Sequence, residues 1–188
     1  MNLADLLQSL PEVKSVNGST DKEIEMICYD SRKAVDRSIY VAIPGMHFDG
    51  HDFIKQAIQN GAVAIVGEND LKMMREDITY IKVENSRRAL ANISSWFYGF
   101  PAKKLDIIGV TGTNGKTTVT YLLKAILDNA GYNTGVVGTI GNIVKDKLLP
   151  AQRTTPESLE LNQLFHQMLN QKVSYVAMEV SSHSLELH

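Results

Sequence analysis

Cysteine is almost absent from this sequence, since Cys28 is the only one in 188 residues. A single thiol cannot form an internal disulfide, so we expect Cys28 to pack as a small buried hydrophobic side chain. No apolar run is long enough to cross a bilayer, and no signal-peptide pattern is present. These absences favour a cytoplasmic protein without a membrane segment.

An excess of charge of either sign is also missing. Nineteen Lys and Arg residues oppose twenty-one Asp and Glu residues, which leaves a formal net charge of -2, and no basic run occurs. A nucleic-acid partner is therefore not expected. The hydrophobic fraction of 44% is ample for a core, and the length lies between one large domain and two small ones.

Residues 1–100 contain short β-like runs that alternate with helical stripes. The runs "EIEMICY", "SIYVAI", "AVAIV" and "ITYIKV" read as strands, whereas "FIKQAIQN" and "SRRALANISSWFYGF" read as helices. This pattern predicts a small α/β domain over residues 1–100.

The pattern starts again at Pro101 and continues through residues 101–188. It reads strand ("LDIIGV"), glycine loop, helix to about Asn129, strand ("TGVVGT"), helix from Pro156 and strand ("SYVAMEV"). Such alternation predicts a parallel sheet with helices on both faces, in which "DIIGV" and "YVAMEV" would be central strands. Ligands of such sheets bind beyond the carboxyl ends of the strands.

The stretch "TGTNGKTT" joins the first of these strands to its helix. Backbone N–H groups of a glycine loop at a helix N-terminus can surround a phosphate, Lys116 adds a cation, and the Thr117 hydroxyl can join Mg²⁺ coordination. The usual first glycine of this motif would fall at Val110, so two later glycines must form the turn. An ordinary strand-to-helix turn is the alternative. The predicted ATP-binding residues are Gly112, Thr113, Asn114, Gly115, Lys116, Thr117 and Thr118, with Lys116 as the catalytic cation.

Two further positions carry polar groups at the predicted ligand edge. Thr154, Thr155 and Pro156 fit a helix start, with a hydroxyl cap and proline at the first helical position, or an anion site. Glu179 ends a buried strand, where an unpaired charge would be costly. A Mg²⁺ ion shared with Thr117 would neutralise it, and an ion pair with a lysine is the alternative.

"GVTGTNGKTT" resembles the ATP-binding loop of the Mur ligases and of their folylpolyglutamate synthetase relatives. "YDSRKAVDRSIYVAIPGMHFDGHD", "TTPES" and "MEVSSHSLELH" resemble the branch of the Mur ligases that adds a diamino acid. The resemblance follows the whole chain in order, but only through the first domain and the opening part of the second of three. It therefore implies a fold class of α/β type, with a uridine-nucleotide-binding domain followed by the first part of a parallel-sheet P-loop ATPase domain.

The resemblance also implies roles for individual residues. Ser31 would contact the UDP-muramoyl substrate, whereas the spacing of "DSR" by itself favours a turn with a local ion pair among Asp30, Ser31 and Arg32. Thr154 and Thr155 would contact the acidic muramoyl dipeptide, and Ser181 would be a further substrate contact. Glu179 would be a Mg²⁺ ligand. His183 is either near the metal or structural.

The implied reaction is an ATP-dependent amide ligation. A carboxylate of UDP-N-acetylmuramoyl-L-alanyl-D-glutamate would attack the γ-phosphate of ATP, and the amine of a diamino acid would displace phosphate from the acyl phosphate. Meso-diaminopimelate is favoured as the diamino acid, and L-lysine stays open. As a fragment, the chain is expected to bind nucleotide weakly, to form no amide bond and to leave strand edges unpaired. A folylpolyglutamate-synthetase-like ligase and a non-catalytic ATP-binding module are the alternatives.

Overall fold

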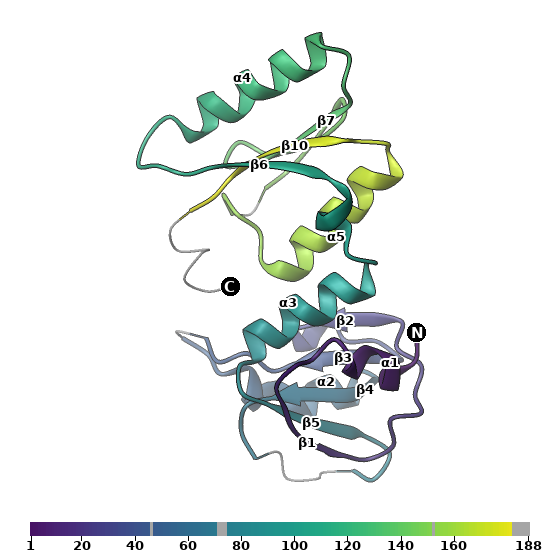
Figure 1. Ribbon diagram of the computed structural model, residues 1–188. Coiled ribbons are helices and arrows are strands. Elements are labelled where there is room, and N and C mark those ends of the chain that lie inside the picture. The colour runs from purple at the N-terminus through teal and green to yellow at the C-terminus, as the bar shows by residue number, and fades with distance from the viewer. Residues whose placement is uncertain (46, 71–74, 152, 182–188) are drawn as a thin grey trace. The chain divides into compact units, whose positions relative to one another are not determined.

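The computed structural model describes residues 1–188 except for 46, 71–74, 152 and 182–188. The chain divides into two compact units, Met1–Phe97 and Tyr98–His188. Each unit has its own five-stranded sheet, and each is described here by itself (Figure 1).

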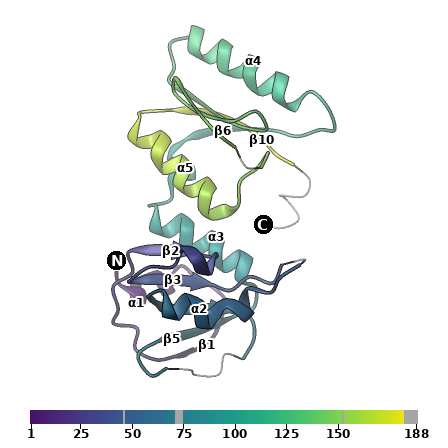
Figure 2. The same cartoon turned by 180° about the vertical axis from the view of Figure 1, so that it is seen from behind.

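The first unit is a mixed α/β layer structure. Its sheet has the order β1-β5-β4-β3-β2, in which β1 is antiparallel to β5 and the other neighbours are parallel. Helix α2 covers one face, while α1 and α3 lie together on the other (Figures 1 and 2). The elements are α1 (Leu3–Leu7), β1 (Val13–Asn17), β2 (Met26–Cys28), η1 (Ser31–Lys33), β3 (Ser38–Val41), η2 (Gly50–Phe53), α2 (Ile54–Gln59), β4 (Ala62–Gly67), β5 (Thr79–Val83) and α3 (Ser86–Phe97).

The apolar runs of the first unit form the buried strands of its core. All four residues of β3 and five of the six in β4 are buried, as expected for strands covered on both faces. On the α2 face, Ile54, Ala57 and Ile58 pack with Tyr40 and with further buried residues of the central strands. Cys28 is also buried in this cluster, as the sequence predicted.

The second unit contains the parallel strands predicted for residues 101–188. Strands β6, β10 and β7 are parallel and adjacent, and an antiparallel hairpin, β8–β9, extends the sheet beyond β7. Helix α4 lies on one face and α5 on the other (Figure 1). The elements are η3 (Pro101–Lys104), β6 (Asp106–Val110), α4 (Lys116–Asn129), β7 (Thr134–Val137), β8 (Asn142–Val144), β9 (Lys147–Leu149), α5 (Ser158–Asn170) and β10 (Tyr175–Glu179). The predicted α/β fold class is confirmed.

The prediction that both apolar strands are central is half wrong. Strand β10 lies between β6 and β7 and is buried along four of its five residues. Strand β6 is at the edge of the sheet, pairs with β10 alone among the described strands, and buries none of its residues. An apolar run shows that a strand can be covered, but it does not show how many neighbours the strand has.

Helix α4 is apolar but is covered on one side only. Of the residues of α4, all of which the structure describes, only Thr120 is buried. Val119, Leu122 and Ile126 are 42%, 57% and 64% exposed. These three positions share one helical stripe. The open edge of β6 and this stripe leave apolar surface in contact with solvent.

No helix within the described residues is both long and apolar enough to cross a membrane.

Candidate nucleotide and metal site

The glycine loop has the backbone that its two glycines permit. Gly112 has φ 141° and Gly115 has φ 79°, both in the left-handed region that other residues adopt at a cost. Gly115 is the N-cap residue of α4, and Lys116 is the first residue of the helix. Glycine has no side chain to cap the helix, so the N–H groups of the first turn are left for a ligand.

Lys116 folds back over this loop. Its Nζ atom donates a hydrogen bond to the carbonyl oxygen of Gly112 at 2.6 Å. Residues 111–115 are exposed, and Lys116 is half-buried. A cation therefore lies beside the row of N–H groups, which is the electrostatic arrangement that suits a phosphate.

Glu179 lies at the end of the central strand β10 and is only 1% exposed. Its Oε1 atom accepts hydrogen bonds from the Thr117 hydroxyl at 3.0 Å and from the Thr139 backbone N–H at 3.0 Å. The Thr139 hydroxyl lies 3.1 Å from Oε2. Within the described part of the chain, no lysine or arginine forms an ion pair with Glu179.

Gly138 makes room for this carboxylate. A Cβ atom at Gly138 would lie 2.3 Å from Glu179 Oε1 and 3.0 Å from its Cδ. Contacts this short do not occur between atoms that are not bonded, so any side chain here would displace the Glu179 carboxylate.

Thr155 does not cap a helix, contrary to the prediction from the sequence. Helix α5 begins at Ser158, with Glu157 as its N-cap residue and no side-chain capping bond. The Thr155 hydroxyl instead donates to the Glu179 backbone oxygen at 3.0 Å and accepts from the Ser181 N–H at 3.3 Å. The Thr155 hydroxyl is therefore bonded to the end of β10 and to the segment that follows it, and α5 begins only at Ser158.

Thr154 lies in the same network. Its hydroxyl oxygen is 3.1 Å from that of Thr139, which itself contacts Glu179. The structure thus brings together Thr117, Thr154, Thr155 and Glu179, together with the backbone of Ser181. His183 lies outside the described residues.

Ser31 belongs to the first unit and is 5% exposed. Its hydroxyl donates to Gln56 Oε1 at 2.6 Å, and its carbonyl oxygen accepts from Asn60 Nδ2 at 2.9 Å. The neighbouring Arg32 guanidinium binds the Asp30 carboxylate at 2.7 Å and lowers the pKa of that carboxyl. The turn with a local ion pair is therefore present, and substrate contact by Ser31 stays a prediction.

Sequence reasoning did not single out Thr139 or Gly138. Both follow β7 directly, within the "TGVVGT" run, and so lie at the carboxyl edge of the sheet. A hydroxyl residue one or two positions beyond a parallel strand was the available signal. It becomes informative only once the strand order places β7 beside β10.

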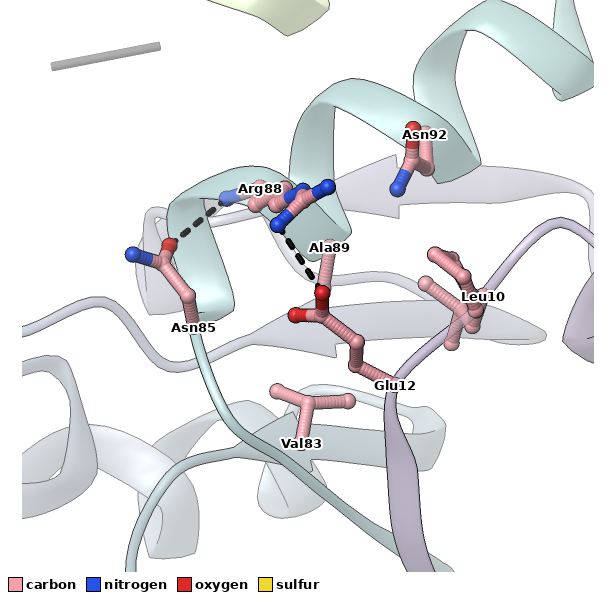
Figure 3. Close-up of a pocket in the computed structure, with 8 residues that line it drawn as sticks. Leu10, Glu12, Val83, Asn85, Arg88, Ala89 and Asn92 are labelled. Atoms are coloured by element: carbon pink, nitrogen blue, oxygen red, sulfur yellow. Dashed lines mark hydrogen bonds and ion pairs between the residues drawn. The ribbon is translucent and has the colours of Figure 1, made fainter.

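A shallow pocket in the first unit is not a second candidate. It lies between the end of β5, the start of α3 and the segment after α1, and is lined by Leu10, Pro11, Glu12, Val83, Asn85, Arg88, Ala89 and Asn92 (Figure 3). Arg88 forms an ion pair with Glu12 at 2.9 Å, and Asn85 Oδ1 accepts from the Arg88 N–H at 2.8 Å (Figure 3). These polar groups stabilise the start of α3.

The oxygen atoms around Glu179 fit a Mg²⁺ ion that is also bound to phosphate. No group of three or more His, Cys, Asp and Glu residues that could hold a metal occurs among the described residues. Mg²⁺ bound to a nucleotide needs fewer protein ligands, since phosphates and waters complete its octahedron. Thr117 Oγ1 and Glu179 Oε1, which lie 3.0 Å apart, are oxygen atoms of the kind that Mg²⁺ takes as ligands.

Comparison with known families gives two matches that follow one another along the chain. Residues 23–98 match the Mur ligase family catalytic domain, and residues 110–188 match the Mur ligase middle domain. The second match includes the glycine loop, Thr139, Thr154 and Glu179.

Curated relatives match over the whole of this chain. Proteins named UDP-N-acetylmuramoyl-L-alanyl-D-glutamate--2,6-diaminopimelate ligase are 48% identical in Caldanaerobacter subterraneus subsp. tengcongensis and 52% identical in Clostridium botulinum. The alignments cover 100% of this chain but 38% and 39% of those relatives.

Two solved structures that are similar to this chain are also ligases of the Mur type. A structure of a UDP-N-acetylmuramoyl-L-alanyl-D-glutamate--2,6-diaminopimelate ligase has a TM-score of 0.79 at 25% identity, and covers 100% of this chain and 37% of that one. MurF ligase from Thermotoga maritima in complex with ADP has a TM-score of 0.54 at 25% identity, with coverage of 84% and 32%.

Proposed function

Because the chain belongs to the Mur ligase family, we propose that it supplies the nucleotide-binding part of an ATP-dependent ligase. The ligase adds 2,6-diaminopimelate to UDP-N-acetylmuramoyl-L-alanyl-D-glutamate, as the names of the relatives indicate. The ligation itself is proposed for a protein of the relatives' length, since this chain spans 38% of the first of them. A reaction that consumes ATP and a uridine nucleotide is proposed to take place in the cytoplasm.

The observation that carries this proposal is the pair formed by Thr117 and Glu179. Their oxygen atoms lie 3.0 Å apart at the N-terminus of α4, next to the loop that contains Gly112 and Gly115. A hydroxyl on the first helical turn and a buried carboxylate on the neighbouring strand are the ligand types that Mg²⁺ takes when it is bound to ATP.

In the proposed reaction, a substrate carboxylate oxygen attacks the γ-phosphorus of ATP, and the bond to the bridging oxygen of ADP breaks. The amine nitrogen of the diamino acid then attacks the acyl carbon, phosphate leaves with the electrons of the broken C–O bond, and the nitrogen loses a proton. The N–H groups of residues 112–117 hold the phosphates in line, and Lys116 neutralises negative charge that develops on them. Thr117 and Glu179 would hold a Mg²⁺ ion, which would supply further charge neutralisation for the phosphates.

The remaining predicted site residues are proposed to contact the muramoyl substrate. Thr154 and Thr155 are proposed to face the acidic part of the muramoyl substrate, with Ser181 beside them, and Ser31 is proposed to contact its UDP-muramoyl part. In support, Thr154 and Thr155 lie within hydrogen-bonding distance of Thr139 and of the Glu179 backbone, beside the proposed metal site.

Titration of the chain with fluorescent mant-ATP tests the nucleotide proposal. We expect weak binding that Mg²⁺ strengthens, and we expect Glu179→Gln to lose that strengthening while keeping the metal-free affinity. Glu84→Gln is the matched control, since it removes an exposed carboxylate of the first unit that lies 3.6 Å from Lys14. Absence of nucleotide binding, with or without Mg²⁺, would contradict the proposal.

A further inference from the structure

Thr139 connects the end of β7 with Glu179 at the end of β10 and with Thr154, which precedes α5. It follows β7, its backbone N–H donates to Glu179 Oε1 at 3.0 Å, and its hydroxyl oxygen is 3.1 Å from Glu179 Oε2. The same hydroxyl oxygen is 3.1 Å from that of Thr154. Thr139 therefore contacts both oxygen atoms of the proposed metal ligand and a proposed substrate residue.

The number of hydrogens fixes the direction of these bonds. A threonine hydroxyl carries one hydrogen and two lone pairs, whereas a carboxylate only accepts. The single hydrogen of Thr139 is therefore donated to Glu179, and the contact with Thr154 requires Thr154 to donate to Thr139. The result is a chain of donors that runs from Thr154 through Thr139 to Glu179.

The residues around the Glu179 carboxylate restrict its position. Glu179 is 1% exposed, and Gly138 faces it so closely that a Cβ atom would lie 2.3 Å from Oε1. The Thr117 hydroxyl and the Thr139 N–H both donate to Oε1, and the Thr139 hydroxyl contacts Oε2, so both carboxylate oxygens are held by hydrogen bonds. Groups that orient a metal ligand in this way change metal affinity roughly 10- to 100-fold when they are removed.

We propose that Thr139 is a positioning residue that orients the Glu179 carboxylate toward a nucleotide-bound divalent cation and couples it to the Thr154 hydroxyl. This inference rests on the proposed function, because it requires that a cation with its nucleotide binds beside Thr117. It adds a residue to the site and a hydrogen-bonded connection between the proposed metal ligand and the proposed substrate segment.

The test compares Thr139→Val with Thr139→Ser in the full 188-residue chain. Valine keeps the shape and the backbone N–H but removes the hydroxyl, whereas serine keeps the hydroxyl. The readout is the ratio of the mant-ATP dissociation constants measured in EDTA and in Mg²⁺. We expect Thr139→Val to reduce this ratio roughly tenfold without changing the affinity in EDTA, and Thr139→Ser to retain it.

A double-mutant cycle with Thr154→Val tests the coupling. Because Thr154 acts on Glu179 through Thr139, Thr154→Val should reduce the ratio in the parent chain and have no further effect in Thr139→Val. Thr139 is exposed and Thr154 is half-buried, so variants at both positions are expected to fold, and circular dichroism verifies this.

The outcomes separate the inference from the proposed function. A wild-type chain that binds mant-ATP more tightly with Mg²⁺, together with an unchanged ratio in Thr139→Val, would overturn the inference and leave the nucleotide site in place. Additive effects of the two substitutions would overturn the coupling. A wild-type chain that binds no nucleotide would overturn both.

Discussion

Replacing Gly138 by alanine gives the sharpest test of the arrangement around Glu179. The new Cβ atom would lie 2.3 Å from Glu179 Oε1, so the carboxylate would have to retreat by roughly 1 Å to reach ordinary contact distance. Its bonds to the Thr117 hydroxyl and the Thr139 N–H, both 3.0 Å long, cannot survive that shift together.

The expected loss of stability follows from these contacts. Overpacking of a filled site costs about 1–3 kcal/mol, and a hydrogen bond to a charged group contributes about 1.5–3 kcal/mol. Since the side chain will relax in part, we expect Gly138→Ala to lower the free energy of unfolding of the second unit by about 2–4 kcal/mol.

Hydrogen exchange measured by mass spectrometry in increasing urea can follow each unit separately. Peptides from β7 and β10 should exchange faster in Gly138→Ala, while peptides from β4 of the first unit should not change. Gly109→Ala is the matched control, because a Cβ atom there would meet Val180 Cγ2 at 3.4 Å, an ordinary contact. Equal protection of β10 in Gly138→Ala and the wild type would refute the reasoning.

Three other predictions concern Lys116, Ser31 and Cys28. Lys116→Ala should weaken mant-ATP binding but leave the melting temperature unchanged, because the Lys116 ammonium contacts the exposed loop, through the Gly112 carbonyl oxygen. Unchanged mant-ATP binding, or a lower melting temperature, would contradict a role of Lys116 in phosphate binding. Ser31→Ala should cost the first unit about 1–2 kcal/mol, because it removes a partly buried hydrogen bond from the Ser31 hydroxyl to Gln56. In urea unfolding followed by Trp96 fluorescence, the exposed Arg32→Ala should lower the free energy of unfolding less than Ser31→Ala does. A larger loss in Arg32→Ala would contradict a stabilising role of the Ser31 hydroxyl. Burial raises the pKa of the Cys28 thiol from 9.0 to about 11, so iodoacetamide at pH 8 should label it only in urea. The corresponding stability is fully present below pH 9 and is lost as the pH rises toward about 11, and rapid labelling of the folded chain would contradict this assignment.

The sequence predicted that polar residues gather at the carboxyl edge of the second sheet, because the signals for these residues are local. Two glycines before a helical run require a particular backbone, and the observed φ angles of Gly112 and Gly115 match that requirement. Glu179 was notable because an acidic residue at the end of a buried strand needs a partner. Both arguments use residues that are close together along the chain.

The features that the sequence did not predict depend on distant neighbours. The edge position of β6 is set by strand order, and the runs "DIIGV" and "YVAMEV" are apolar in the same way. The late start of α5 reflects bonds from Thr155 to Glu179 and Ser181. The hairpin β8–β9 consists of three-residue strands, which are too short to give a periodic signal.

The two edge strands of the second sheet differ in the length of backbone that they leave unpaired. On one side, the short antiparallel hairpin β8–β9 ends the sheet with three-residue strands, which offer little backbone for pairing. On the other side, β6 presents five residues with one backbone edge unpaired among the described strands. Among the described strands, β6 therefore offers the longer unpaired edge to a polypeptide designed to lengthen this sheet, and β9 offers the shorter one.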